Sequence, residues 1–236
     1  MNTLASELAT VCRDHLLREK WLIAPSRRVG HQWLDSLALG GESAVNVHIK
    51  TLRSMAVDLA SPVMLERKAT LVSPQGALFL MDRVLRRLPK GLKYLASAAG
   101  DQRLAETVLS SIEAVRLAGL DPLNLDHGCL EVHAKSEDFA AIAAVYANDL
   151  ASEQLVGYSD ILQMAIDRLT DNLGCMGDEI IVLVPDDLRP SGLERKFLES
   201  LPSARRHVLR TDLSADASTE KTVESNLERL RWLRIP

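Results

Sequence analysis

The N-terminal part of the chain alternates between two spacings of apolar residues. From Leu4 to Arg18 they recur every three or four positions, which predicts an amphipathic helix. The runs Lys20 to Ala24 and Ala44 to Ile49 have the short apolar or alternating pattern of strands, and helical spacing resumes after each of them. Two consecutive strand-to-helix units favour a parallel sheet with helices packed on it.

The middle of the chain, from Ser73 to Leu173, is almost uninterruptedly helical in pattern. Its expected helices span Pro74 to Leu88, Arg103 to Ala118, Ser136 to Glu153 and Ser159 to Asn172. Glycine and proline mark the breaks between these helices, as at 89–91 and 119–122. This segment is therefore expected to form a helical lobe.

Strand pattern returns after the helical segment. The β-branched run Glu179 to Val184 suits a strand buried on both faces. A helix from Gly192 to Leu201 and a strand from His207 to Arg210 are expected to follow it. A last helix over Leu227 to Leu233 ends abruptly at Pro236, as in a piece of a longer protein.

Strand segments thus lie on both sides of the helical segment in the sequence. We expect an α/β core made of residues 1–70 and 175–236, with an inserted helical lobe at residues 71–174. The strands that precede Pro25, Thr51 and Pro185 should lie side by side in one parallel sheet.

Composition narrows the class of protein. The 236 residues are 47% hydrophobic and 25% charged, which is ordinary for a globular protein. A net charge of −4 excludes a strongly basic nucleic-acid module but still allows a local basic patch. The longest apolar runs are far shorter than the roughly 20 residues that span a bilayer, and no signal-peptide core begins the chain. We therefore expect a cytoplasmic protein without a membrane segment.

The cysteines and histidines show no site pattern. Cys12, Cys129 and Cys175 are far apart and odd in number, so we expect three reduced, buried side chains rather than disulfides or a zinc site. The 6 histidines have no metal-ligand spacing, and no Gly-x-Ser-x-Gly motif accompanies a serine. Neither a metal nor a cofactor is expected.

The loop after the first expected strand stands where a phosphate-binding P-loop would lie. Pro25 and Gly30 keep the spacing of the two glycines of that motif. His31 replaces the lysine that reaches the outer phosphates, and Gln32 replaces the hydroxyl residue that binds Mg²⁺. The segment is therefore either a plain strand-to-helix turn or a degenerate nucleotide site.

Three residues in this loop favour the second interpretation. Ser26, Arg27 and Arg28 lie where a helix begins, and a helix N-terminus attracts phosphate. Arg27 and Arg28 are the one arginine pair expected at the carboxyl end of a strand, where open α/β sheets bind ligands. Lys50 and Thr51 follow the second expected strand, and Thr51 is a plausible cap for the next helix.

Asp186 and Asp187 follow the expected strand that ends at Val184. An acidic pair at this position can hold Mg²⁺ beside a nucleotide. The same two residues, with Pro190 close behind, are equally typical of a turn that starts a helix. The degenerate nucleotide site would thus comprise Ser26, Gly30, His31, Asp186 and Asp187.

Several segments, in order, resemble the N-terminal helicase-like region of AddB-type subunits of bacterial helicase-nucleases. The similarity covers most of residues 20 to 210, in the segments Trp21 to Arg28, Val45 to Leu52, Ser111 to Pro122, Lys135 to Leu169 and Ile180 to Leu201. The chain departs from active helicases of superfamily 1 in lacking Gly-Lys-Thr, the usual Asp-Glu pair and a Gly-Asp-x-x-Gln motif.

The resemblance implies a P-loop-NTPase-like, superfamily 1 helicase-like α/β fold whose ATP site is too degraded to hydrolyse nucleotide. It implies a non-catalytic role in double-strand-break repair, in which Arg27, Arg28, Lys50 and Thr51 contact single-stranded DNA or broken duplex ends and another surface binds a partner helicase-nuclease subunit. It leaves open whether the longer protein is an exonuclease subunit. An active nucleotide-binding ATPase and a protein-interaction domain without DNA affinity are the alternatives.

Overall fold

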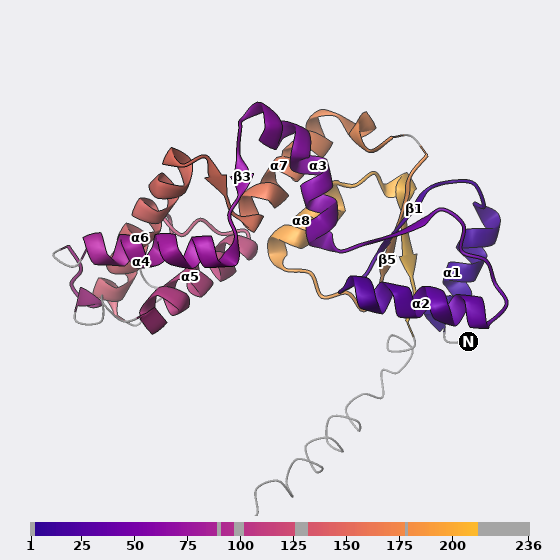
Figure 1. Ribbon diagram of the computed structural model, residues 1–236, viewed down its shortest axis with the longest axis horizontal. Coiled ribbons are helices and arrows are strands. Elements are labelled where there is room, and N and C mark those ends of the chain that lie inside the picture. Colours follow the sequence, from indigo (N-terminus) through magenta and orange to yellow (C-terminus); the bar gives the residue numbers. More distant parts are fainter. Residues whose placement is uncertain (1–2, 89–90, 97–101, 126–131, 178, 212–236) are drawn as a thin grey trace, which may run out of the picture. The chain divides into compact units, whose positions relative to one another are not determined.

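The computed structural model describes residues 3–88, 91–96, 102–125, 132–177 and 179–211. The chain forms two compact units (Figure 1). Among the described residues, the sheet unit takes in residues 3–52, 177, 179–189 and 203–211. The helical unit comprises Arg53–Met176 and Pro190–Pro202. The helix expected at Leu227 to Leu233 and the expected burial of Cys129 lie outside the described residues.

The sheet unit is built on four parallel strands in the order β2-β1-β5-β6. They are β1 (Lys20–Ile23), β2 (Val47–Lys50), β5 (Ile181–Pro185) and β6 (Arg206–Leu209). In β1, which lies between β2 and β5, Trp21 is opposite His48 of β2 on one side and Val182 of β5 on the other. The predicted α/β fold with one parallel sheet is confirmed. The sequence also predicted a buried strand in the run Glu179 to Val184. This burial is confirmed, because all five residues of β5 are buried.

The start of β2 differs from the prediction. The alternating pattern begins at Ala44, but β2 begins at Val47. Asn46 has φ of 54°, a left-handed conformation that interrupts an extended strand. Its carbonyl oxygen accepts the first bond to β1, from the amide of Lys20 at 2.8 Å. The strand therefore starts where the backbone returns to the extended region.

Two helices, α1 (Thr3–Asp14) and α2 (Arg27–Leu39), belong to this unit. Their apolar faces share one core with alternate residues of the strands, because successive strand side chains point to opposite faces. The core residues from these elements include Leu8, Cys12, Leu37, Leu22, Leu183 and Leu209. Cys12 is thus buried and free, as expected, whereas Cys175 is free but only half-buried.

The helical unit contains α3 (Leu52–Glu66), α4 (Pro74–Arg87), α5 (Gln102–Leu117), α6 (His133–Ser152), α7 (Tyr158–Asp171) and α8 (Gly192–Ser200). The first residue of α3, Leu52, still belongs to the sheet unit, and the helical unit begins at Arg53. The four helices expected between Ser73 and Leu173 are present, with ends shifted by three residues or fewer. By its contacts this unit also includes α3 and α8, which the sequence pattern groups with the α/β core. No helix among the described residues is long and apolar enough to cross a membrane.

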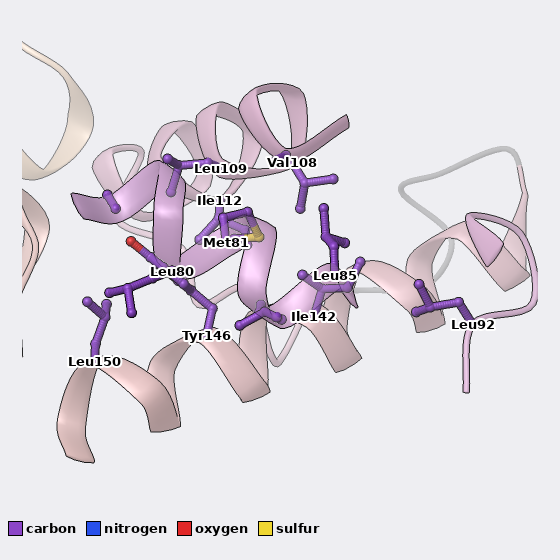
Figure 2. Close-up of a cluster of buried hydrophobic side chains, with 14 residues drawn as sticks. Leu80, Met81, Leu85, Leu92, Val108, Leu109, Ile112, Ile142, Tyr146 and Leu150 are labelled. Carbon is purple, nitrogen blue, oxygen red and sulfur yellow. The ribbon is translucent and has the colours of Figure 1, made fainter. Parts of the chain in front are cut away.

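The core of the helical unit lies among α4, α5 and α6 (Figure 2). Each helix contributes residues three or four positions apart, as the amphipathic patterns predict. The side chains labelled in Figure 2 from these helices are Leu80, Met81, Leu85, Val108, Leu109, Ile112, Ile142, Tyr146 and Leu150.

A buried carboxylate fixes the segment after α4. Asp138 of α6 is 2% exposed and accepts hydrogen bonds from the backbone amides of Lys93 (2.9 Å), Tyr94 (2.8 Å) and Leu95 (2.8 Å). Burial raises the pKa of Asp138, but these amides and the charge of Lys93 outweigh it, so the pKa lies below its usual value.

A short two-stranded sheet interrupts the helical pattern, contrary to the expectation of nearly continuous helix. β3 (Thr70–Leu71) pairs in parallel with β4 (Leu155–Val156). Strands of two residues are too short to show a periodicity, and their pairing joins segments far apart in the sequence. A signal exists nevertheless, because a Leu-Val pair precedes the helix start at both Ser73 and Gly157.

Candidate functional site

The sheet brings together the residues predicted to form a site. Parallel strands end at one edge of a sheet, and the loops that follow β2, β1 and β5 are neighbours there because these strands are neighbours. This carboxyl-terminal edge carries Ser26, Arg27 and Arg28 after β1, Lys50 and Thr51 after or at the end of β2, and Asp186 and Asp187 after β5.

The connection from β1 to α2 is a tight turn that leads directly into a helix. Only Ala24, Pro25 and Ser26 separate the two elements. The Ser26 hydroxyl accepts the amide of Val29 at 3.3 Å, and the Ser26 carbonyl accepts the amide of Gly30 at 3.1 Å. These two amides already serve the helix cap and first turn, so they are not arranged as a cradle around a phosphate.

Gly30 is buried inside α2, where the helix passes close to the sheet. A Cβ atom at this position would lie 2.4 Å from Cγ2 of Ile49 and 3.2 Å from Cβ of Ala24. The contact with Ile49 explains the glycine by packing alone. His31, the next residue, is exposed on α2. The nucleotide-binding role of this segment stays a prediction, and Ser26 and Gly30 have structural roles as cap and packing residue.

Asp186 joins the ends of β5 and β6. Its Oδ1 atom accepts hydrogen bonds from the amide of Thr211 at 2.9 Å and from the Thr211 hydroxyl at 2.8 Å, and its own amide donates to Leu209 at 2.9 Å. These bonds agree with the structural alternative for this acidic residue, while Asp187 is half-buried beside it. The described part of the chain has no group of three or more His, Cys, Asp or Glu side chains placed to hold a metal ion.

Basic side chains give the edge its positive charge. Arg27 and Arg28 are exposed in the first turn of α2. Lys50 is half-buried, with its Nζ atom 5.2 Å from the centroid of the Trp21 ring. The indole N–H of Trp21 donates to Oε1 of Glu19 at 2.7 Å, which fixes the ring under the ammonium group. The Lys50 position is therefore held by a cation–π contact.

A second place of chemical interest lies in the helical unit and was not found from the sequence. A cavity of about 230 Å³ is lined by residues that include Arg53, Arg116, Tyr146 and Tyr158. The helical periodicity predicts that Tyr146 is a core residue and that the two arginines lie on helix surfaces. The local sequence pattern therefore does not indicate that these residues line one cavity. The repeated Leu-Val pair before α4 and α7 is the signal that could have located the cavity.

No family model matches this sequence, and no curated protein shows significant sequence similarity to it. The fold itself defines the class: an α/β protein with a parallel four-stranded sheet and helices.

Proposed function

We propose that this chain is a non-catalytic, helicase-like part of an AddB-type subunit that binds DNA in double-strand-break repair. The observation that carries the proposal is the turn after β1. There the amides of Val29 and Gly30 are bonded to Ser26, while Arg27 and Arg28 remain exposed at the same turn. The place that a P-loop-NTPase-like fold uses for nucleotide is thus built as a helix start with two cations beside it.

The same geometry argues against ATP hydrolysis. Phosphoryl transfer needs positive charge on the outer phosphates and a bound Mg²⁺ ion. His31 and Gln32 stand where the lysine and the metal-binding hydroxyl would be, and Asp186 is already bonded to Thr211. We therefore expect no DNA-stimulated release of phosphate from ATP above a buffer blank.

The DNA contacts are expected at the carboxyl-terminal edge of the sheet. Arg27, Arg28 and Lys50 supply positive charge, and Thr51 stands where the chain enters α3. Contacts of this kind bind the phosphate backbone and do not read base sequence. Their free energy comes largely from released counterions, so affinity should fall steeply with salt. The net charge of −4 keeps binding weak in the absence of the proposed partner helicase subunit.

A fluorescence-anisotropy titration of single-stranded and forked DNA at several salt concentrations tests the proposal. The variant Arg27→Ala, Arg28→Ala, Lys50→Ala should bind more weakly, and its plot of log affinity against log salt should lose about 0.7 in slope for each phosphate contact removed. The matched control is Arg67→Ala, Arg86→Ala, Arg195→Ala, which removes equal charge from exposed positions of the helical unit.

The outcomes separate the alternatives. Equal losses in both triple variants would mean that net charge, and not this edge, governs binding. The absence of binding by the wild type at low salt would favour a protein-interaction domain. ATP hydrolysis that is stimulated by DNA and abolished by Asp186→Ala would establish an active ATPase and refute the non-catalytic role.

A further inference from the structure

The cavity of the helical unit lies where its two short strands lead into helices. β3 is followed by α4 and β4 by α7, and both connections, at Ser73 and Gly157, line the cavity. The apolar part of the lining includes Ala77, Ile112 and Leu150. Ligands of α/β folds commonly bind at the carboxyl ends of parallel strands, and here the space is also partly enclosed.

The lining of the cavity includes a tyrosine hydroxyl that has no hydrogen-bond partner among the described residues. Tyr146 is 5% exposed, lines the cavity and belongs to the core of α4, α5 and α6. Figure 2 shows its hydroxyl at the end of the cluster where Leu80 and Leu150 lie, opposite to Leu92. Among the residues that the structure describes, this hydroxyl makes no hydrogen bond with another group. Because Tyr146 lines the cavity, this hydroxyl can bond a polar group of a ligand that enters it.

The Tyr146 hydroxyl is neutral under physiological conditions. Burial, and then the negative charge of Glu113, raise the pKa of Tyr146 to about 12. The group therefore keeps its proton and is able both to donate and to accept a hydrogen bond.

The charges beside Tyr146 compensate one another. Arg116 of α5 forms an ion pair with Asp160 of α7, with Nη1 3.3 Å from Oδ2 and Nη2 bonded to Oδ1. Asp160 also accepts the amide of Gly157 at 2.8 Å, which fixes the pair in place. Glu113, one turn before Arg116, lines the same cavity. The cavity thus offers donors and an acceptor with little net charge, which favours a neutral polar ligand over an anion.

The rim of the cavity carries an aromatic ring that is covered by a cation. The guanidinium carbon of Arg53 lies 5.2 Å from the centroid of the Tyr158 ring. The Tyr158 hydroxyl donates to Oε1 of Glu194 at 2.8 Å, and Glu194 is itself held by the amide of Ser191 at 2.8 Å. Aromatic rings and guanidinium planes are the groups on which unpaired bases stack.

We propose that this cavity takes one unpaired base of single-stranded DNA. A base is planar, has apolar faces and a neutral edge of donors and acceptors, and so matches the apolar lining beside Tyr146, Arg116 and Glu113. The volume of about 230 Å³ lies below the roughly 300–1,000 Å³ typical of small-molecule pockets, so a single base fits better than a complete nucleotide cofactor. The inference rests on the proposed DNA-binding function and adds a site in a different unit of the chain.

The test uses the full chain and the variant Tyr146→Phe, which removes only the hydroxyl. Because that hydroxyl has no partner among the described residues, the thermal stability should stay equal or rise. Affinity for an oligothymidine should fall by about two- to tenfold, the equivalent of one hydrogen bond. The matched control is Tyr94→Phe, since Tyr94 is half exposed in the same unit and does not line the cavity. An oligonucleotide of abasic residues should bind wild type and Tyr146→Phe equally.

A photocrosslink gives an independent readout of the contact. An oligonucleotide that contains 5-iodo-2′-deoxyuridine should attach to a peptide that includes Tyr146 or Tyr158. Equal affinity of Tyr146→Phe and wild type for the oligothymidine, or crosslinks confined to the sheet unit, would overturn the base site. The edge variant Arg27→Ala, Arg28→Ala, Lys50→Ala would still bind more weakly in that case, and the proposed function would stand.

Two other outcomes also decide the question. A wild type that binds no oligonucleotide at low salt would refute the proposed function, and the base site with it. A Tyr146→Phe variant with unchanged DNA affinity but weaker binding to a partner helicase subunit would show that the cavity accepts a protein side chain, and would overturn the proposal.

Discussion

Gly30→Ala is the change that most directly tests how α2 packs on the sheet. The added methyl group would lie 2.4 Å from Cγ2 of Ile49, well inside van der Waals contact, and Ile49 is β-branched and cannot swing this atom away without moving the whole side chain. Overpacking of this kind costs about 1 to 3 kcal/mol. Alanine is also the better helix former by about 1 kcal/mol, which offsets part of the cost.

The net effect of Gly30→Ala should therefore be a loss of up to about 2 kcal/mol in the free energy of unfolding. The sign should reverse in a chain that already carries Ile49→Ala, because that substitution removes Cγ1 and Cγ2 and leaves room for the new methyl group. In this background the 3.2 Å approach to Cβ of Ala24 offsets part of the helix preference, so Gly30→Ala should stabilise the chain by less than about 1 kcal/mol.

Urea unfolding measured by tryptophan fluorescence is a suitable assay, since Trp21 and Trp33 both belong to the sheet unit. The four chains of the double-mutant cycle give the coupling between the two positions. Equal destabilisation by Gly30→Ala in both backgrounds would refute the packing account. Gly30 would then have to be explained by another need, such as close approach of a ligand to its backbone.

Two further predictions concern the helical unit. Asp138→Asn should lower the free energy of unfolding by about 1 to 3 kcal/mol at pH 7, because backbone amides lose a charged acceptor. The folded state lowers the pKa of Asp138, so the difference in unfolding free energy between wild type and Asp138→Asn should be complete above the ordinary carboxyl pKa of about 4. The difference should shrink as the pH falls through the lowered pKa of the folded state. Urea unfolding measured across that pH range tests this. Gly192→Ala should cost about 1 to 3 kcal/mol, because its Cβ would lie 2.4 Å from the carbonyl oxygen of Ala118, and a melting temperature equal to that of wild type would contradict this contact.

The sheet could be predicted because the strands β1, β2 and β5 can be recognised from local sequence patterns. The solid apolar run at β5 and the strand-to-helix steps after β1 and β2 are local patterns, and the parallel pairing follows from the way such steps connect. The roles of individual residues at the carboxyl-terminal edge of the sheet were harder to predict from the sequence. The sequence places Gly30 near a phosphate-binding motif, but only the structure shows that Ile49, nineteen positions away, occupies the space of its side chain.

The cavity could not be predicted for a related reason. The spacing along α6 assigns Tyr146 correctly to the core. Which groups surround its hydroxyl, however, depends on residues of α4, α5 and α7. The ion pair of Arg116 with Asp160 likewise joins helices that are separated in sequence by α6. Helical periodicity reports which face of a helix is buried, and it contains no information on which residue of another helix lies opposite.

The discontinuity of the sheet has a consequence for the order in which the protein folds. β1 and β2 are made early, but β5 pairs with β1 only after Arg53–Met176 has been synthesised. At ribosomal speeds that segment takes roughly ten seconds, during which one side of β1 has no partner strand. Contacts among α4, α5 and α6 are closer in sequence and can form within this interval. The helical unit is thus positioned in the chain to fold while the nascent sheet still has an open edge, and substitutions that slow its folding should increase aggregation during synthesis.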